Sequence, residues 1–347
     1  MLEFFLNIDT TCINPDICNF DKTPTAAIIV FEIVVVLGSA IALFFLTKLK
    51  EKIGLRFLIM AIGIFIFELF TAPMWHNFRM GWWAYLYRDV SWILTIGWSA
   101  MILTVVLGVD RLLGQLAEWK RFLVYLAILM VLVSGLEILV VNLGIRAYAP
   151  EVLESSVDVF VAGVPLVDVL YYTPVFTGLV IGFYKYWSWW IDNTLLIPVK
   201  QQKWWRNLLI AFLAVFLFEV MVEPMVQNQN LPQWSYIFRD ISILMTGLWI
   251  LIVWMATNLI DQFLIATNPV VKFLITLLIT GLFALPLESF FILTGFRVYG
   301  PSAIANFTGI LTPITKIPVE VAFAIPCYMA LVICFIEYWE TLLDNRL

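Results

Sequence analysis

Nine apolar stretches divide this chain of 347 residues, and they constrain its fold more than any other feature. They cover approximately residues 26–47, 57–74, 91–109, 122–143, 163–185, 207–226, 241–260, 272–294 and 317–338. A helix needs about 18 or more predominantly apolar residues to cross a bilayer. Inside the bilayer the backbone must satisfy its own hydrogen bonds, so each stretch is predicted to be helical. The sequence therefore predicts an all-α polytopic integral membrane protein with about nine transmembrane helices.

The composition excludes a soluble globular protein. Hydrophobic residues make up 63% of the chain and charged residues 13%, whereas soluble domains carry roughly 45–50% apolar and about 25% charged residues. The net charge is −5 and no basic stripe is visible, which argues against nucleic acid as a partner. We expect the lipid bilayer to be the main partner, and the composition leaves the oligomeric state open.

The basic residues predict the orientation of the chain. They gather after the first, third and fifth stretches, at Lys48, Lys50, Lys52 and Arg56, at Arg111, Lys120 and Arg121, and at Lys200, Lys203 and Arg206. These three loops share one side, and loops rich in Lys and Arg usually face the cytoplasm. The acidic N-terminal segment (Glu3, Asp9, Asp16, Asp21) falls on the other side. We expect a plasma-membrane protein with its N-terminus outside and its C-terminus in the cytoplasm.

A tandem duplication is visible in the polar and aromatic residues. At an offset of 151 residues, Glu68 coincides with Glu219 and Glu137 with Glu288. The same offset relates Pro73 to Pro224, Asn77 to Asn228, Trp83 to Trp234, Tyr85 to Tyr236, Arg88 to Arg239, Asp89 to Asp240, Arg146 to Arg297 and Tyr148 to Tyr299. One inserted residue then shifts the offset to 152, so that Asp168 matches Glu320.

This duplication predicts the domain organisation. An outer segment with the first helix (1–54) precedes two four-helix repeats (55–193 and 205–347). Four is an even number of spans, so both repeats have the same orientation in the membrane. Many secondary transporters use inverted repeats, although parallel ones also occur.

The matched carboxyl groups gather at the predicted outer ends of the helices. An ionised carboxylate at the bilayer centre costs about 2.5–3.5 kcal/mol, so keeping several of them needs a reason. A structural reason is that arginine–carboxylate pairs hold helices together. A chemical reason is that burial favours the neutral carboxylic acid, which can act as a general acid near neutral pH.

The second repeat carries one additional acid. Glu223 follows Glu219 by four residues, which predicts that both lie on one helix face, whereas the first repeat has Ala72 there. Because like charges disfavour ionising both groups, one of them should stay protonated. The candidate catalytic residues are Glu219, Glu223, Glu288, Glu68 and Glu137. The candidate substrate-binding residues are Trp234, Tyr236, Tyr299, Trp83, Tyr148, Asp168 and Glu320.

We expect neither a metal nor a cofactor. His76 is the only histidine, which excludes a metal site built from several imidazoles, and no glycine-rich phosphate loop is visible. Cys12 and Cys18 lie in the polar N-terminal segment, where they are either bridged or free depending on whether the compartment is oxidising. An Asn306-Phe307-Thr308 sequon lies on the predicted outer side.

Two motifs resemble those of the integral-membrane carotenoid hydratase family. In one, an acidic residue opens a stretch that ends in Thr-Gly-Phe and a tyrosine, and a helix that starts with Val-Pro or Ile-Pro follows. The chain matches it with Glu288, Thr294-Gly295-Phe296, Tyr299 and Ile317-Pro318. In the other, an acidic pair spaced by four precedes a proline, as in Glu219, Glu223 and Pro224.

The family order of these motifs runs here from Glu137 through Val164-Pro165 to Glu223, so the resemblance covers roughly residues 120–240. The chain departs from the pattern at Leu143-Gly144-Ile145, which replaces Thr-Gly-Phe. It also has glutamates at the acidic pair, where the family has the other acidic type.

The resemblance implies an enzyme that adds water to the end of an acyclic or monocyclic carotenoid. A neutral carboxylic acid would protonate a terminal isoprenoid double bond, and aromatic faces would stabilise the carbocation. Water captures this cation in a hydratase and an internal double bond captures it in a cyclase; the sequence is compatible with both.

Two other classes of protein stay open. A transporter or channel for a small or lipid substrate requires polar residues along the whole crossing path. The predicted cytoplasmic halves of the helices are nearly free of charge, which argues against that class. A non-catalytic membrane subunit would use the buried carboxyl groups for folding alone.

Overall fold

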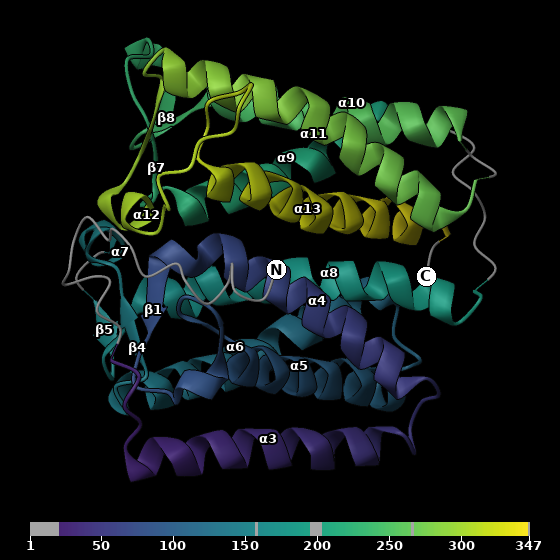
Figure 1. Ribbon diagram of the computed structural model, residues 1–347. Coiled ribbons are helices and arrows are strands. Elements are labelled where there is room, and N and C mark those ends of the chain that lie inside the picture. The colour runs from purple at the N-terminus through teal and green to yellow at the C-terminus, as the bar shows by residue number, and fades with distance from the viewer. Residues whose placement is uncertain (1–20, 157–158, 195–202, 265–266, 346–347) are drawn as a thin grey trace.

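The computed structural model describes residues 21–156, 159–194, 203–264 and 267–345. Within these residues, nine long helices run roughly side by side (Figure 1). They are α3 (Ala26–Leu46), α4 (Ile53–Thr71), α5 (Trp92–Leu112), α6 (Glu118–Asn142), α8 (Thr173–Ile191), α9 (Trp204–Val222), α10 (Ile243–Phe263), α11 (Pro269–Leu293) and α13 (Val319–Asn345). The predictions for Cys12, Cys18, the acidic residues before Asp21, and Lys200 lie outside the described residues.

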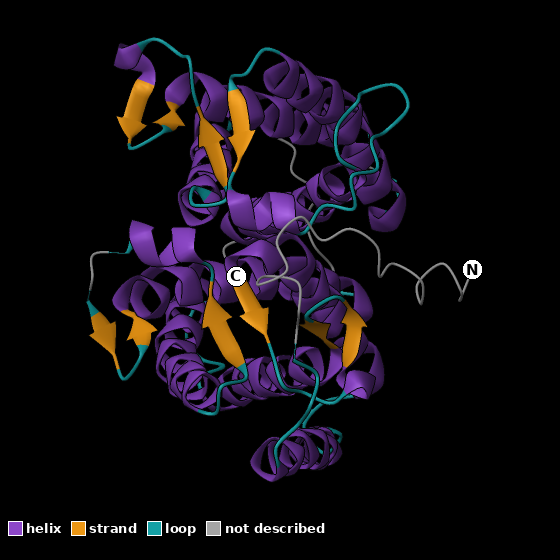
Figure 2. Ribbon diagram, turned by 60° about the vertical axis from the view of Figure 1, so that its left-hand side comes forward, coloured by secondary structure: helices purple, strands orange, loops and turns teal. Residues whose placement is uncertain are grey.

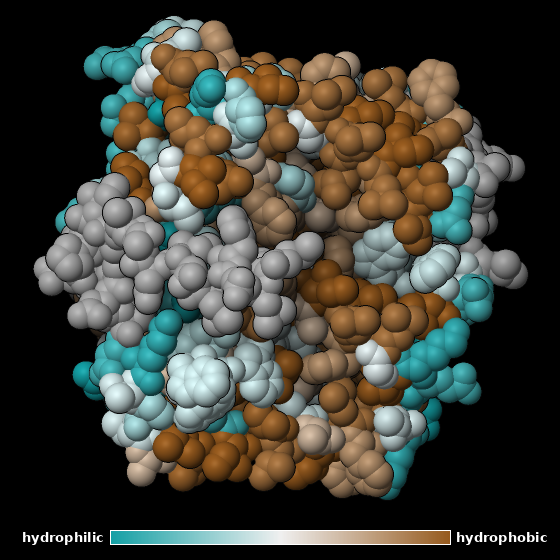
Figure 3. Space-filling view, in the orientation of Figure 1, coloured by the Kyte–Doolittle hydropathy of each residue, from teal (hydrophilic) through white to brown (hydrophobic). Residues whose placement is uncertain are grey.

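Eight of these helices, all except α8, are long and apolar enough to cross a membrane. The fifth predicted span (163–185) corresponds to α8. This helix carries Lys185 and several tyrosines and tryptophans, and most of its side chains are buried against other helices. Hydrophobic residues cover the middle of the surface in Figure 3, and hydrophilic residues gather toward its two ends. The prediction of an all-α polytopic membrane protein is confirmed.

Short strands and turns cap one end of the helices (Figures 1 and 2). They are β1 (Trp75–Asn77), β2 (Tyr85–Tyr87), β3 (Val90–Ser91), β4 (Arg146–Tyr148), β5 (Phe160–Val161), β6 (Val164–Pro165), β7 (Val226–Asn228), β8 (Tyr236–Phe238), β9 (Ile241–Ser242) and β10 (Arg297–Tyr299), with the short helices α7 (Pro150–Ser155) and α12 (Pro301–Ala305). We call this the strand end. The opposite end, which carries Lys48, Lys50 and Lys52, is the basic end.

The order of elements occurs twice. The series α4, β1, β2, β3, α5, α6, β4, α7, α8 is followed by α9, β7, β8, β9, α10, α11, β10, α12, α13. Strand pairing repeats in the same register, with Asn77 opposite Arg146 and Asn228 opposite Arg297. The first series forms the lower bundle in Figure 1 and the second forms the upper one. Helix α3 packs mainly on α5, at the edge of the first bundle.

The two bundles meet along α8 and α13, which lie side by side in the centre (Figure 1). Gly182 of α8 faces Phe335 of α13 so closely that an added Cβ would lie 2.7 Å from the ring and 3.3 Å from its Cα. Nearby, the rings of Trp189 and Tyr338 stack with centroids 5.2 Å apart. The absence of a side chain at position 182 therefore sets the spacing between the bundles.

Charged side chains are buried at the basic end. Lys185 Nζ lies 2.6 Å from Asp110 Oδ2 and 2.8 Å from Glu118 Oε1. In the second bundle, Lys272 Nζ lies 3.3 Å from Glu337 Oε2. The prediction that the cytoplasmic halves of the helices are nearly free of charge is therefore wrong. These charged residues lie near the ends of separate helices in the sequence, and packing of neighbouring helices brings them together into buried groups.

Replacing Gly182 with alanine should weaken the joint between the bundles. Overpacking in a filled interior costs about 1–3 kcal/mol, so the free energy of unfolding should fall by that amount. Thermal unfolding of the purified protein in detergent measures the change. Gly135→Ala is the matched control because no atom lies within 4 Å of a Cβ added there; alanine's better helix propensity should leave it unchanged or more stable. Equal stability of both variants would contradict the close packing.

Candidate functional site

Each repeat builds its site where a helix ends and the chain turns back as a strand. Gly144 follows α6 with a φ of +71° and Gly295 follows α11 with a φ of +70°. Glycine adopts this left-handed conformation without the steric penalty of a Cβ. The turns lead into β4 and β10, and Arg146 and Arg297 on these strands reach back to glutamates in the preceding helices.

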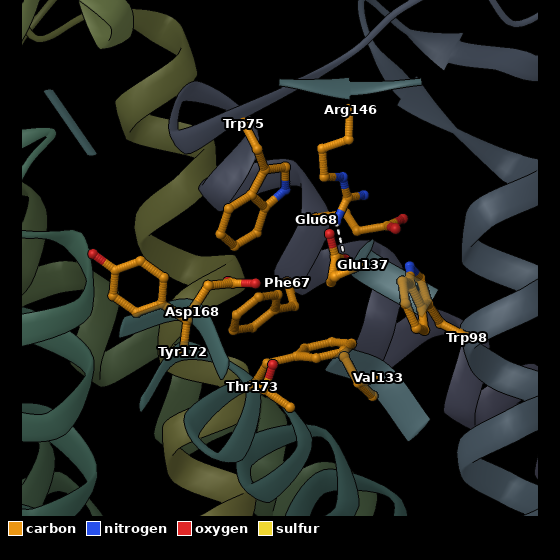
Figure 4. Close-up of a pocket in the computed structure, with 11 residues that line it drawn as sticks. Phe67, Glu68, Trp75, Trp98, Val133, Glu137, Arg146, Asp168, Tyr172 and Thr173 are labelled. Carbon is orange, nitrogen blue, oxygen red and sulfur yellow. Dashed lines mark hydrogen bonds and ion pairs between the residues drawn. The ribbon is translucent and has the colours of Figure 1, made fainter. Parts of the chain in front are cut away.

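In the first repeat this arginine contacts both a glutamate and an asparagine. Arg146 forms an ion pair with Glu137 through Nη1 and donates from Nε to Asn77 Oδ1 at 3.1 Å. Figure 4 shows Arg146 reaching from its strand toward Glu137. The Thr95 hydroxyl donates to Glu68, which joins α4 to α5. Among these side chains, only Oε2 of Glu137 has no hydrogen-bond partner.

A small cavity adjoins this site. Its volume is about 30 Å³, which is room for about two water molecules and too small for an organic substrate. Trp75 and Trp98 line it on either side (Figure 4), and Asp168 lies at its margin, where it accepts a hydrogen bond from Tyr148 at 2.9 Å. We interpret the first-repeat site as structural, because its groups bond mainly to one another.

The matched residues of the second repeat form a different set of hydrogen bonds and ion pairs. Arg297 Nη1 lies 3.3 Å from Glu288 Oε2, and Tyr299 donates to the other oxygen of Glu288. Arg297 Nε and Asn228 Oδ1 have no hydrogen-bond partner among the described residues, although the matched atoms of the first repeat bond to each other. Oε2 of Glu219 also has none. Buried polar groups left unsatisfied need an explanation, for which a ligand or water is one candidate.

A pocket of about 170 Å³ is lined by Glu219, Glu288, Arg297 and Tyr299 of this set. Glu219, Glu288 and Arg297 form its polar side. Apolar and aromatic residues form its walls: Phe70, Phe218, Val222, Ala324, Ile325 and Tyr328. The rings of Phe218 and Tyr328 stack against each other, with their centroids 3.8 Å apart. The first repeat also contributes Leu69, Ala72, Pro73, Arg88 and Asp89, so the pocket lies between the two repeats.

Glu223 does not share this pocket. Helix α9 ends at Val222, and Arg239 Nη1 lies 3.5 Å from the Glu223 carboxylate. The charged groups that act on Glu219 are Arg297 and Glu288. The predicted Glu219–Glu223 acid pair is therefore wrong, because Glu219 interacts with Arg297 and Glu288 whereas Glu223 pairs with Arg239.

Glu223 acts instead on Asp240 in the turn between β8 and β9. Burial, together with the Glu223 carboxylate, raises the pKa of Asp240 from 3.8 to about 7. At the other side of the site, burial raises the pKa of the Tyr299 hydroxyl well above its usual value. Tyr299 therefore acts as a neutral hydrogen-bond donor toward Glu288.

Three predicted substrate-binding residues lie outside the pocket. Trp83 Nε1 donates to Glu32 Oε2 at 3.0 Å, and Trp234 is 71% exposed on the surface. The Tyr236 hydroxyl donates to Asn228 O at 3.3 Å within its own turn. These positions match between repeats because they shape the strand end. Tyr299 and Glu320 line the pocket, whereas Tyr148 and Asp168 belong to the first-repeat site.

Several residues of the two sites were missed by the sequence analysis. Thr95 and Trp98 match Thr246 and Trp249 at the offset of 151, so the repeat itself carried the signal. Tyr328 has no tyrosine counterpart in the first repeat, and only packing places it against the pocket.

The matched arginines Arg88 and Arg239 join the repeats. Arg88 Nη1 donates to the carbonyl of Ala305 at 3.2 Å, and Arg239 Nη2 donates to the carbonyl of Ser155 at 2.7 Å. Each therefore reaches from one repeat to the end of a short helix in the other. Asp89, the neighbour of Arg88, lies 3.0 Å from His76 Nδ1. These two arginines therefore link the repeats to each other.

Comparisons with protein-family models, with characterised proteins and with solved structures return no match. Within the described residues, no group of three or more His, Cys, Asp or Glu side chains is arranged to hold a metal ion. The assignment of a function therefore rests on the geometry of the pocket.

Neutralising Asp240 should change how stability depends on pH. With a pKa of about 7, the folded protein keeps a proton that the unfolded chain releases near pH 4, so wild-type stability falls as the pH rises from about 4 to about 7. Asp240→Asn removes this loss. Solvent screening limits the gain at pH 8 to about 1 kcal/mol, or about 2–4 °C in the melting temperature.

Melting curves of both proteins at pH 4 and pH 8 measure this difference, which should vanish at pH 4. Asp89→Asn is the matched control in the first repeat. It loses the contact with His76 and should gain no stability at pH 8. A gain at pH 8 in both variants would contradict the role of Glu223.

Proposed function

We propose that the protein is a membrane-embedded enzyme that protonates a double bond of an isoprenoid, carotenoid or related lipid, leading to hydration or cyclisation. The observation that supports it best is Oε2 of Glu219, a buried carboxyl oxygen with no hydrogen-bond partner among the described residues. This oxygen lies in a pocket where apolar and aromatic walls meet the polar side chains of Glu288 and Arg297, with Arg88, Asp89, Asn306 and Glu320 also in the lining.

Glu219 is the proposed acid because of how charge is distributed around it. Arg297, the arginine that acts on Glu219, pairs with Glu288, so these two carboxyl groups share one guanidinium. An isolated carboxylate in apolar surroundings is so costly that the group instead keeps its proton. Glu219 is then the neutral acid, and Glu288 is held by contacts with Arg297 and Tyr299.

The walls of the pocket suit a hydrocarbon substrate. Phe218, Trp249 and Tyr328 present aromatic rings beside Glu219, and aromatic faces attract cations by about 2 kcal/mol or more when desolvated. A pocket of about 170 Å³ holds the end of a long isoprenoid. The remainder of such a chain would lie among the apolar side chains between the repeats.

The proposed reaction balances without a co-reactant other than water. The π electrons of the terminal double bond take the proton of Glu219, which leaves a tertiary carbocation and a carboxylate. In a hydratase, water adds to the cation and its extra proton returns to Glu219. In a cyclase, an internal double bond attacks the cation, and loss of a proton from the product restores the acid.

A second candidate function is transport of a small or lipid substrate coupled to protons. The observation that favours it is the buried charge at the basic end, which the sequence analysis did not anticipate. The pocket between two repeats also suits a transported ligand. For either function, the distribution of basic residues supports a plasma-membrane location with the N-terminus outside and the C-terminus in the cytoplasm.

The enzyme proposal predicts a new lipid in a bacterium that accumulates lycopene and other polyprenoids. Chromatography and mass spectrometry of lipid extracts would detect it. A product heavier by one water indicates a hydratase, and a product of equal mass and altered retention indicates a cyclase. Glu219→Gln should lower its yield by about 100-fold or more, as expected for removal of a general acid.

Glu68→Gln is the matched control, since it makes the same change at the equivalent position of the first repeat, where Glu68 accepts a hydrogen bond from Thr95. It should retain the product. Ala72→Glu places the second repeat's residue in the wall of the pocket and should also abolish the product by filling the site. Unchanged extracts from well-folded wild type, or full activity of Glu219→Gln, would refute the enzyme proposal.

A further inference from the structure

We propose that the second repeat carries a proton pathway across the membrane, between an acidic cluster at the basic end and the pocket at the strand end. It does not depend on the reaction proposed for Glu219. The groups that carry it are buried inside one bundle, and their counterparts in the other bundle differ in charge and size.

The acidic cluster lies between α10, α11 and α13. Lys272 pairs with Asp261 and lies 3.3 Å from Glu337 Oε2. Glu340 is 1% exposed, and neither of its carboxyl oxygens has a hydrogen-bond partner among the described residues. Three acidic groups therefore surround a single lysine. At least one must bind a proton or another cation, because an unpaired buried charge is too costly.

The groups that face Glu340 come from every helix of the bundle. They are Glu337 on its own helix, Asp261 on α10, Lys272 on α11 and Arg206 on α9. Arg206 does not neutralise the cluster, because its guanidinium pairs with Asp344 through two nitrogens. The excess of negative charge is therefore confined to a buried site at the basic end.

The first repeat has no such excess. Asp110 and Glu118 face Arg121 and Lys185, two acids against two bases, with Arg121 Nη1 2.8 Å from Asp110 and Lys185 Nζ 2.8 Å from Glu118. At the offset of 152 residues, Lys185 of the first repeat corresponds to Glu337 of the second. Together with Glu340 in place of Ser188 and Pro269 in place of Glu118, this reversal of charge converts a neutral network into an acidic one.

Buried polar residues recur along α11 between the acidic cluster and the pocket, and the hydroxyls of Thr276 and Thr280 each donate to the carbonyl four residues earlier. Thr276, Thr280, Ala284 and Glu288 follow Lys272 at intervals of four residues, and all four are buried. Sixteen residues of α-helix span about 24 Å, most of the hydrocarbon thickness of about 30 Å. The first repeat has Tyr125, Leu129 and Val133 where α11 has Thr276, Thr280 and Ala284.

Further polar groups lie close to the acidic cluster at the basic end. Thr257 and Asn258 on α10 are buried about one turn from Asp261, and Asn207 near the start of α9 donates to Asn258 Oδ1 at 3.1 Å. Hydroxyl groups both donate and accept hydrogen bonds, as a relay of protons requires. Only Ala284 separates Thr280 from Glu288 in this series on α11, about 12 Å along the helix, so transfer at that level uses transient water.

The pathway predicts proton flux through purified protein in liposomes. An imposed membrane potential from a potassium gradient and valinomycin drives protons inward, and trapped pyranine reports the internal pH. Wild-type vesicles should acidify at least severalfold faster than empty vesicles. Thr280→Val, which keeps the side-chain shape and removes the hydroxyl, and Glu340→Gln should each lower the rate by about tenfold.

Thr177→Val is the matched control, since Thr177 is an equally buried threonine in α8 of the first repeat. It should conduct protons like the wild type. Size-exclusion chromatography confirms that each variant is folded before reconstitution. A wild-type rate equal to that of empty vesicles, or equal rates for Thr280→Val and wild type, would overturn the pathway. Activity on lipids is measured separately, so failure of one proposal leaves the other intact.

Discussion

The structure depends on how each repeat neutralises the carboxyl groups buried at its strand end. A buried charge without a partner is strongly destabilising, and each repeat meets this constraint with an arginine that reaches back to a glutamate in the preceding helix. The glycine turn, the short strand and the pairing of that strand with its neighbour all position the arginine. Because β1 pairs with β4 and β7 with β10, the same device also joins the first helix of each repeat to the third.

Duplication produced two bundles that share this device and differ in what surrounds it. In the first bundle, the groups bond to one another and large apolar side chains fill the interior, so the site holds little more than water. In the second, matched hydrogen bonds are missing, small and hydroxyl-bearing residues replace bulky ones, and a pocket opens toward the other repeat. Because the first copy stabilises the fold, the second copy can keep buried polar groups without hydrogen-bond partners. This asymmetry is the basis of both proposals.

Sequence reasoning succeeded where the physical signal is local or repeated. Apolar length predicted the helices, and the offset of 151 residues selected Glu219, Glu288 and Tyr299, which do line the pocket. It failed for Glu223, because packing sets which charged groups meet: Glu219 interacts with Arg297 and Glu288, and Glu223 pairs with Arg239. It also treated Trp234 as a binding residue, although matched aromatic residues equally shape turns. No pattern in a single segment could place Phe70 against Phe218 and Tyr328, which come from three different helices.

The sequence by itself determined that the chain lies in a membrane, that it is helical and that its polar residues occur in two matched sets, because hydropathy and periodicity are properties of neighbouring residues. Only the tertiary structure decided which of those polar groups satisfy one another. Arg146 and Arg297 occupy equivalent positions in the chain, yet one bonds to its asparagine and the other does not. Hydrogen bonding over distances of about 3 Å depends on how helices from both repeats pack, and that packing is set by contacts between residues far apart in the sequence.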